Sequence, residues 1–428
     1  MDSKVVKILT SKKFFEIAFV VVIFTSFVFW VKSIILDRAA SYQWNVFLLD
    51  LTDFEGDFTN VIGYSGSRDP YNCLYYTNLQ EKAYPPLIYV FMYLLSRIVP
   101  IEEYYAADYF LNMYMDPKLL IMMMIVITAM VIAFFEAIRH NLKDTYGMKV
   151  LVSIAMLLTA PVFFSIERGN SIILVIALMT AFVFGHDSDN KILKELSLVG
   201  LAVAAALKIS PALLGILLIY KKDWKAVIRT VIYGIVMFVG PFLFLQGGLS
   251  NIPLMIRNVQ MNNEFYMSKW GLTLYYTLVN YGVPDSMALF KITGLASKVL
   301  CLVMLIAAFK FDRKSDVIMV LSLALIIFPD HSGYYNLLYL VPATVMLINE
   351  EKKYIYDLIA LFAIISFNHL YRFEGLEGGK LDCRTSMVAL IIYCIIITCA
   401  NLYRAKVASG SKDDSEEKKE SKLEESEN

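Results

Sequence analysis

The feature that most constrains this chain is a series of long apolar runs separated by short polar loops. The runs number about twelve and cover Phe14–Leu36, Leu119–Ile138, Val150–Phe164, Ser171–Gly185, Leu193–Leu207, Pro211–Tyr220, Ala226–Leu245, Met287–Phe309, Val317–Phe328, Tyr334–Ile348, Tyr354–Leu370 and Ser386–Tyr403. About twenty apolar residues span the ~30 Å hydrocarbon core as a helix, where every backbone polar group must be paired internally. With 58% hydrophobic and 18% charged residues, the sequence predicts an all-α integral membrane protein of about 12 transmembrane helices.

The basic residues of the short loops predict the orientation. Lys and Arg gather at 139–149, 191–194, 221–225, 310–314, 352–353 and 404–406. All of these loops fall inside if the N-terminus is inside, as the positive-inside rule requires. A further apolar stretch is Ala83–Val99. If it crossed the membrane, the basic loop at 139–149 would lie outside, so we expect this stretch to be a juxtamembrane helix. The sequence thus predicts a multi-pass cell-membrane protein with cytoplasmic N- and C-termini.

Two long outer loops interrupt this pattern within a single predicted membrane domain, residues 1–403. The first, residues 37–117, is acidic and aromatic, and the second, 246–286, contains Arg257 and Lys269. Loops of this length usually carry function or are disordered, and these two are too aromatic for disorder. Residues 404–428 form a charged, low-complexity stretch, which predicts a disordered cytoplasmic tail. Cys73 and Cys383 lie in outer loops; a disulfide between them and two free thiols are both open alternatives.

Four groups of polar residues lie at the predicted outer ends of helices. Asp53 and Asp57 belong to an acidic cluster, which suits either a general base or a solvated loop. Glu167 and Arg168 precede Gly169-Asn170 in a very short loop. They form either an ion pair that anchors the turn or, through the planar guanidinium of Arg168, a phosphate clamp.

The other two groups are a lysine and a histidine. Lys208 precedes Ser210-Pro211 at the join of two short apolar segments, so it either snorkels to the interface or marks a broken helix at a binding site. His331, beside Asp330, is either an inert loop residue or part of the same site. Ionisable groups near membrane depth are costly and call for a reason. Their convergence suits an anionic, partly lipidic substrate, and it also suits a transporter.

Several short motifs occur in an order that resembles the polytopic C-superfamily glycosyltransferases, and within it glycosyltransferase family 87, whose members use polyprenol-phosphate mannose. The motifs are Asp57, Asp69-Pro70-Tyr71, Tyr84-Pro85-Pro86-Leu87, Arg168-Gly169-Asn170, Lys208 with Pro211, and Lys221-Lys222-Asp223-Trp224, all within residues 40–230. The resemblance implies juxtamembrane helices in a long first outer loop, a lipid-phosphate donor and an aspartate base. The motif places this base at Asp57, with Asp53 as the alternative.

These observations predict an inverting membrane glycosyltransferase that acts on the extracytoplasmic face. It would transfer mannose or another hexose from a polyprenyl-phosphate donor to an envelope glycolipid or glycan. The predicted catalytic residues are Asp57, Asp53 and His331, and the predicted substrate-binding residues are Glu167, Arg168, Asn170, Lys208, Arg257, Lys269 and Tyr84. No cofactor or metal is required, because protein cations can stabilise a departing monophosphate.

The sequence leaves two alternative functions. One is a polytopic transporter or flippase of lipids or glycans, which would need ionisable residues at mid-membrane and inverted repeats. The other is a non-catalytic subunit of envelope polymer assembly. Nucleic acid is not an expected partner, because no basic surface is visible outside the loops.

Overall fold

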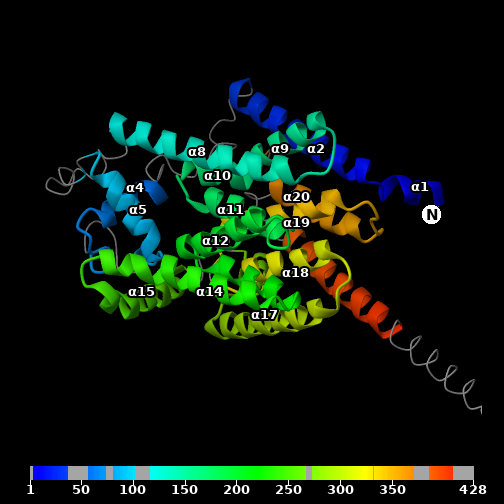
Figure 1. Cartoon of the computed structure of the whole chain (residues 1–428). Coiled ribbons are helices and arrows are strands. Elements are labelled where there is room, and N and C mark those ends of the chain that lie inside the picture. Colours follow the sequence, from blue (N-terminus) through cyan, green and yellow to red (C-terminus); the bar gives the residue numbers. More distant parts are fainter. Residues whose placement is uncertain are drawn as a thin grey trace, which may run out of the picture.

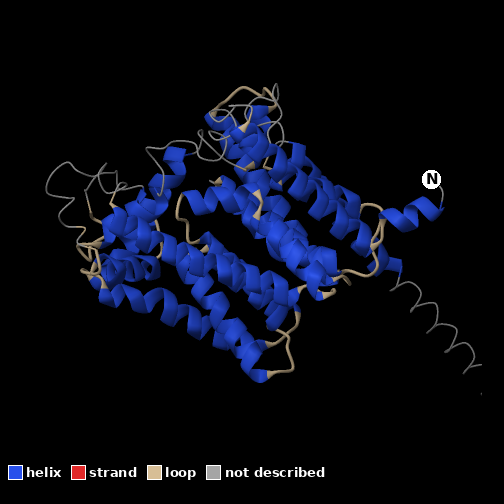
Figure 2. Ribbon diagram, turned by 90° about the horizontal axis from the view of Figure 1, so that it is seen from above, coloured by secondary structure: helices blue, strands red, loops and turns tan. Residues whose placement is uncertain are grey.

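A computed structural model describes residues 3–36, 56–73, 81–99, 101, 116–266, 272–330, 332–370 and 385–407. Within these ranges the chain contains helices and no strands, as Figure 2 shows. Five helices are long and apolar enough to cross a membrane, and a bent pair would make a sixth. An all-helical membrane protein is therefore confirmed. A count of twelve single spanning helices is not, because the remaining apolar helices are shorter.

The long apolar helices are α2 (Lys12–Ile35), α8 (Pro117–Asn141), the helix from Trp224 to Phe244 that contains α14 (Trp224–Val239), the helix from Met287 to Lys310 that contains α17 (Met287–Ala307), and the C-terminal helix Thr385–Val407. Local sequence explains where they begin. Asp116 caps α8 by accepting a hydrogen bond from the Lys118 amide at 2.6 Å, directly before Pro117. An oxygen-bearing cap and a proline in the first turn are both favourable at a helix start.

The shorter helices form the centre of the molecule. They are α11 (Ile172–Gly185), α12 (Lys191–Leu207), α18 (Lys314–Ile327), α19 (Val341–Asn349) and α20 (Asp357–Asn368). Nearly every side chain of α18 is buried, as expected of a helix that is apolar on all sides. In contrast, α14 exposes Ile228, Val231, Ile232, Ile235 and Val236, which makes it suited to contact lipid.

Two apolar runs are broken rather than continuous. The run Val150–Phe164 divides into α9 (Tyr146–Leu157) and α10 (Ala160–Glu167), which meet at 57° just before Pro161. Proline lacks the N–H that would continue the helical hydrogen bonds. After α12, Lys208 takes an extended conformation, and the 3₁₀ helix η2 (Ser210–Gly215) and α13 (Ile216–Tyr220) follow. The broken helix predicted at Lys208 and Pro211 is therefore present.

The two outer loops pack together at one end of the molecule, here called the outer end, which contains α4 (Gly56–Ser65), α5 (Pro86–Ser96) and α15 (Asn251–Tyr266) (Figure 1). The side-chain amide of Asn258 donates to the carbonyl oxygens of Tyr71 at 3.1 Å and Lys82 at 3.2 Å. The 11-residue α5 is about 16 Å long, roughly half the thickness of the hydrocarbon core.

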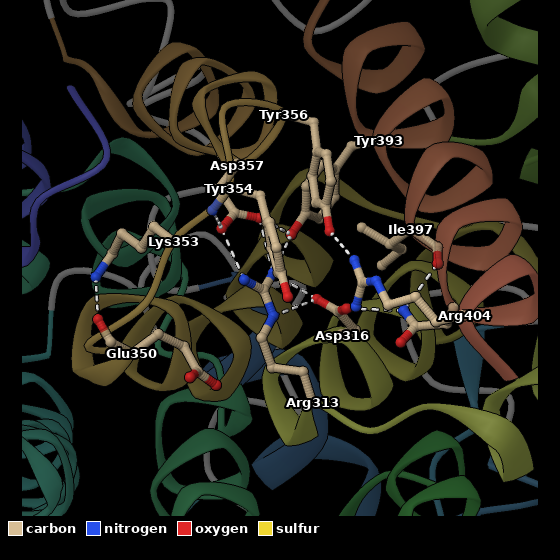
Figure 3. Close-up of polar contacts among 11 residues, drawn as sticks. Arg313, Asp316, Glu350, Lys353, Tyr354, Tyr356, Asp357, Tyr393, Ile397 and Arg404 are labelled. Carbon is tan, nitrogen blue, oxygen red and sulfur yellow. Dashed lines mark hydrogen bonds and ion pairs between the residues drawn. The ribbon is translucent and has the colours of Figure 1, made fainter. Parts of the chain in front are cut away.

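The N-terminus and the end of the C-terminal helix lie at the opposite end, here called the inner end (Figure 1). A buried polar cluster, the inner network, joins three helices there: Arg313, Asp316, Asp357, Tyr393 and Asn401 (Figure 3). The guanidinium of Arg313 contacts Asp316 and Asp357, whose side chains are fully buried. The network therefore fixes the C-terminal helix against α18 and α20.

Candidate active site at the outer end

The amino end of α4 docks on the turn that follows α10. The backbone amides of Asp57 and Phe58 donate to the carbonyl oxygen of Arg168 at 3.0 and 3.2 Å. Gly169 allows this approach, since a Cβ there would lie only 2.6 Å from the Cβ of Phe58 and its φ is +65°. This left-handed backbone strongly favours glycine. The Arg168-Gly169-Asn170 motif thus holds the first outer loop in place.

The carboxylate of Asp57 is the centre of a polar cluster on this turn. Arg168 donates from Nε to Oδ2 at 3.1 Å and from Nη2 to Oδ1 at 3.2 Å. Asn170 donates from Nδ2 to Oδ2 at 2.6 Å. Burial would raise the pKa of Asp57, but the charge and hydrogen bonds of Arg168, the hydrogen bond from Asn170 and the charge of Lys208 hold it below its ordinary value. The carboxylate is therefore ionised at neutral pH.

Lys208 supplies a second cation close to this carboxylate. The charges of Asp57 and Arg168 both act on its ammonium group. Its Nζ lies 4.4 Å from the ring centre of Tyr335 and 5.7 Å from that of Tyr84. Within the described part of the chain it makes no hydrogen bond and no ion pair. Two cations thus lie beside one carboxylate, and the second is held only by aromatic rings.

A pocket opens beside Asp57 and has two unlike walls. Its polar side is made by Asp57, Asn170 and Ser171, together with Gly169 and Tyr84. Its apolar side is made by Val61 of α4 and by Ile88 and Met92 of α5.

The structure brings together four of the predicted site residues: Asp57, Arg168, Asn170 and Lys208, with Tyr84 at their edge. Glu167 is buried at the end of α10, and its predicted role in substrate binding stays a prediction. Arg257 lies exposed on α15 beside Asn258 and is not among the groups that contact Asp57. Asp53, Lys269, His331 and Cys383 lie outside the described residues.

Sequence reasoning missed Tyr335 and the apolar wall. Tyr335 stacks on Phe164, with ring planes at 17° and centres 6.2 Å apart, and so faces Lys208. The only signal was its place two residues after Gly333, next to a segment already singled out. Val61, Ile88 and Met92 carry no signal of their own, because apolar residues at helical spacing are typical of any core-facing helix.

Fold and site together define a polytopic membrane protein whose outer end holds a carboxylate, two nearby cations and a small, half-apolar pocket beside that carboxylate. The sequence pattern of glycosyltransferase family 87 matches residues 83–329, more than half of the chain. This chain therefore belongs to glycosyltransferase family 87 and is a membrane glycosyltransferase. The match includes Tyr84, Arg168, Asn170 and Lys208, whereas Asp57 precedes it. No curated protein and no solved structure matches the chain.

Proposed function

We propose that this glycosyltransferase takes its sugar from a polyprenyl-phosphate donor and acts at the outer end, on the extracytoplasmic face of the cell membrane. The observation that carries the proposal is the ammonium group of Lys208. It is partly buried, lies beside the Asp57–Arg168 pair and has no anionic partner of its own among the described residues. A cation held this way is suited to bind an anion, and a phosphodiester supplies one.

The reaction follows from the two kinds of charge in the cluster. Asp57 accepts the proton of an acceptor hydroxyl, and the acceptor oxygen attacks the anomeric carbon. The bond from that carbon to the phosphate oxygen breaks, and its electron pair leaves with the polyprenyl phosphate. Arg168 and Lys208 stabilise the charge that develops on the phosphate. A single displacement of this kind inverts the anomeric centre.

The apolar wall of the pocket supports the lipid part of the proposal. Val61, Ile88 and Met92 line the same small pocket as Asp57, so apolar side chains lie next to the proposed site of donor binding. The acceptor is an envelope glycolipid or glycan, and the sugar is mannose or another hexose. The orientation required is the one that the basic loops predict, with about twelve crossings and both termini in the cytoplasm.

The test is sugar transfer by membranes that contain the protein. Radiolabelled polyprenyl-phosphate mannose, and the glucose analogue in parallel, are added to membranes with wild-type protein, Asp57→Asn or Asp285→Asn. Asp285 is an exposed outer-end aspartate that accepts a hydrogen bond from Tyr275. General base catalysis contributes about 10²–10⁴-fold, so Asp57→Asn should lose transfer by that factor while Asp285→Asn keeps it.

Two outcomes would contradict the proposal. Full activity of Asp57→Asn together with inactive Asp53→Asn would move the base to Asp53. Full activity of both variants, or no transfer from either donor by wild-type protein, would remove the aspartate-base mechanism or the donor class.

A further inference from the structure

The hydrogen bonds of Asp57 conflict with its use as a base. Its Oδ2 already accepts from Arg168 Nε and Asn170 Nδ2, and its Oδ1 accepts from Arg168 Nη2. Three of its roughly four acceptor positions are thus filled, and each oxygen accepts at least one hydrogen bond. A carboxylate that is stabilised in its charged form by a guanidinium is also a weak base.

The same contacts conflict with the use of Arg168 as a phosphate clamp. Arg168 turns the edge formed by Nε and Nη2 toward Asp57. That edge is one of those that bind phosphate oxygens in bidentate fashion. In this arrangement Asp57, the proposed base, and Arg168, the proposed phosphate ligand, are therefore bound to each other instead of to substrate.

Asn170 is held independently of Arg168. Its Oδ1 accepts the backbone amide of Ile172 at 2.9 Å, which caps the first turn of α11. This hydrogen bond fixes the side-chain amide so that Nδ2 faces Asp57, because only the oxygen can accept from an N–H. Asn170 can thus continue to hold Oδ2 when the guanidinium moves.

We propose that donor binding draws Arg168 from Asp57 to the phosphate and leaves Asn170 as the positioning residue that holds the freed carboxylate toward the acceptor. The inference rests on the proposed function. It adds an order of events. Without donor, Asp57 and Arg168 are paired with each other, and Asp57 becomes effective as a base only when the donor is bound.

A pH profile separates the two states of Asp57. Among the described residues, the groups that face it are Arg168, Asn170, Lys208 and the ring of Tyr84. The acid limb of the pH profile of kcat/KM for the donor reports the pKa of the base in the free enzyme. The acid limb of the profile of kcat reports the pKa of the same group in the enzyme with donor bound. Loss of an adjacent guanidinium raises a carboxyl pKa, so the acid limb of kcat should lie about 1–3 pH units above that of kcat/KM. The donor phosphodiester stays ionised throughout this range.

The variant Asn170→Asp tests the positioning role. Aspartate caps a helix as well as asparagine does, and in the donor-free site Arg168 would still offset the added charge beside Asp57. The proposal predicts a second carboxylate against Asp57 and an acid limb of kcat raised by about one pH unit or more. Asn190→Asp is the matched control, because Asn190 caps α12 through the amides of Ile192 and Leu193. It should leave both limbs unchanged.

The results distinguish this inference from the proposed function. If Asp57→Asn is inactive, the limbs of wild type are separated and only Asn170→Asp shifts the limb of kcat, the inference holds. If Asp57→Asn is inactive but the two limbs coincide, or Asn170→Asp behaves like wild type, the exchange of partners is wrong and the base mechanism survives. Full activity of both Asp57→Asn and Asp53→Asn, or no transfer by wild type from either donor, would instead overturn the proposed function itself.

Discussion

The two ends of the molecule each contain an arginine paired with a buried or half-buried aspartate, and they use the pair differently. At the inner end, Arg313 contacts two carboxylates, Asp316 and Asp357, neither of which is exposed at all. At the outer end, one carboxylate, Asp57, lies near two cations, Arg168 and Lys208, and the exposed fractions of the Asp57 and Arg168 side chains are 16% and 20%.

The remaining hydrogen-bond partners sharpen this difference. In the inner network, Tyr393 donates to Asp357 at 2.8 Å, the Tyr354 amide donates to the same residue at 2.8 Å and Asn401 donates to Asp316 at 2.9 Å. The carboxylates are satisfied by the protein itself, as a structural network requires. At the outer end a cation is left with aromatic partners beside a pocket. An ion pair alone does not identify a functional site. A cation without its own carboxylate partner, such as Lys208, near a carboxylate that lines a pocket, such as Asp57, is the more informative feature.

The largest expected effect is on the inner network. Arg313→Ala should lower the free energy of unfolding by about 3–5 kcal/mol, since it leaves two carboxylates buried without their cation. The melting temperature of detergent-solubilised protein measures this effect. Protein that remains folded should keep its affinity for the donor. Unchanged stability would show that the inner network is not the anchor of the C-terminal helix.

Arg168→Lys should show the reverse pattern. A lysine keeps the charge but cannot make the bidentate contact, and a lost charge-assisted hydrogen bond to phosphate costs about 1.5–3 kcal/mol. We expect kcat/KM for the donor to fall by about 10–150-fold, with little change in melting temperature. Arg139→Lys, at an exposed pair with Glu136 on α8, is the control. Equal donor kinetics in Arg168→Lys and wild type would refute the clamp.

Gly169→Ala tests whether the turn holds the outer site together. The new Cβ would meet Phe58 and require a left-handed residue, a strain of about 1–3 kcal/mol. Gly147→Ala, where a Cβ meets no atom within 4 Å, is the control. Asp57 should shift away from Asn170, so transfer falls more than stability does. If the two alanine variants are equally active, the turn does not position Asp57.

The smallest expected effect is at a partly exposed pair of the inner end. Lys194 contacts Asp223 at 2.6 Å, and the exposed fractions of the two side chains are 26% and 30%. Exposed pairs contribute about 0–1 kcal/mol, so Lys194→Met should change neither stability nor transfer beyond that range. A loss of stability as large as that of Arg313→Ala would contradict the distinction between the buried inner network and more exposed ion pairs.

Hydropathy was sufficient to predict the apolar helices, because each predicted apolar run corresponds to one helix or to a broken series, but not the helices of the outer loops, such as α4 and α15. The break at Lys208 was also predicted, since Pro211 cannot continue a helix. The break between α9 and α10 was not, although Pro161 was visible within the run. A proline ends a helix only where neighbouring segments satisfy the freed carbonyl, and that depends on packing.

The sequence was sufficient to identify most residues of the site but not the contacts between them. Arg168, Asn170 and Lys208 were all identified, whereas an ion pair between Arg168 and its neighbour Glu167 was one of two alternatives. The structure pairs Arg168 with Asp57, more than a hundred residues earlier, through the docking of α4 on the turn. Tyr335 was missed for a related reason: an aromatic ring that holds a cation leaves no pattern in the local sequence.

The most direct test of the difference between the two ends is binding of decaprenyl phosphate, followed as thermal stabilisation of the purified protein. Ligand at about 100 times its Kd stabilises the folded state by about 2.7 kcal/mol. Wild type should gain this stability, and so should Lys298→Gln, whose lysine pairs with Asp330. Lys208→Gln should lose most of the gain. Equal stabilisation of Lys208→Gln and wild type would contradict a phosphate site at the outer end.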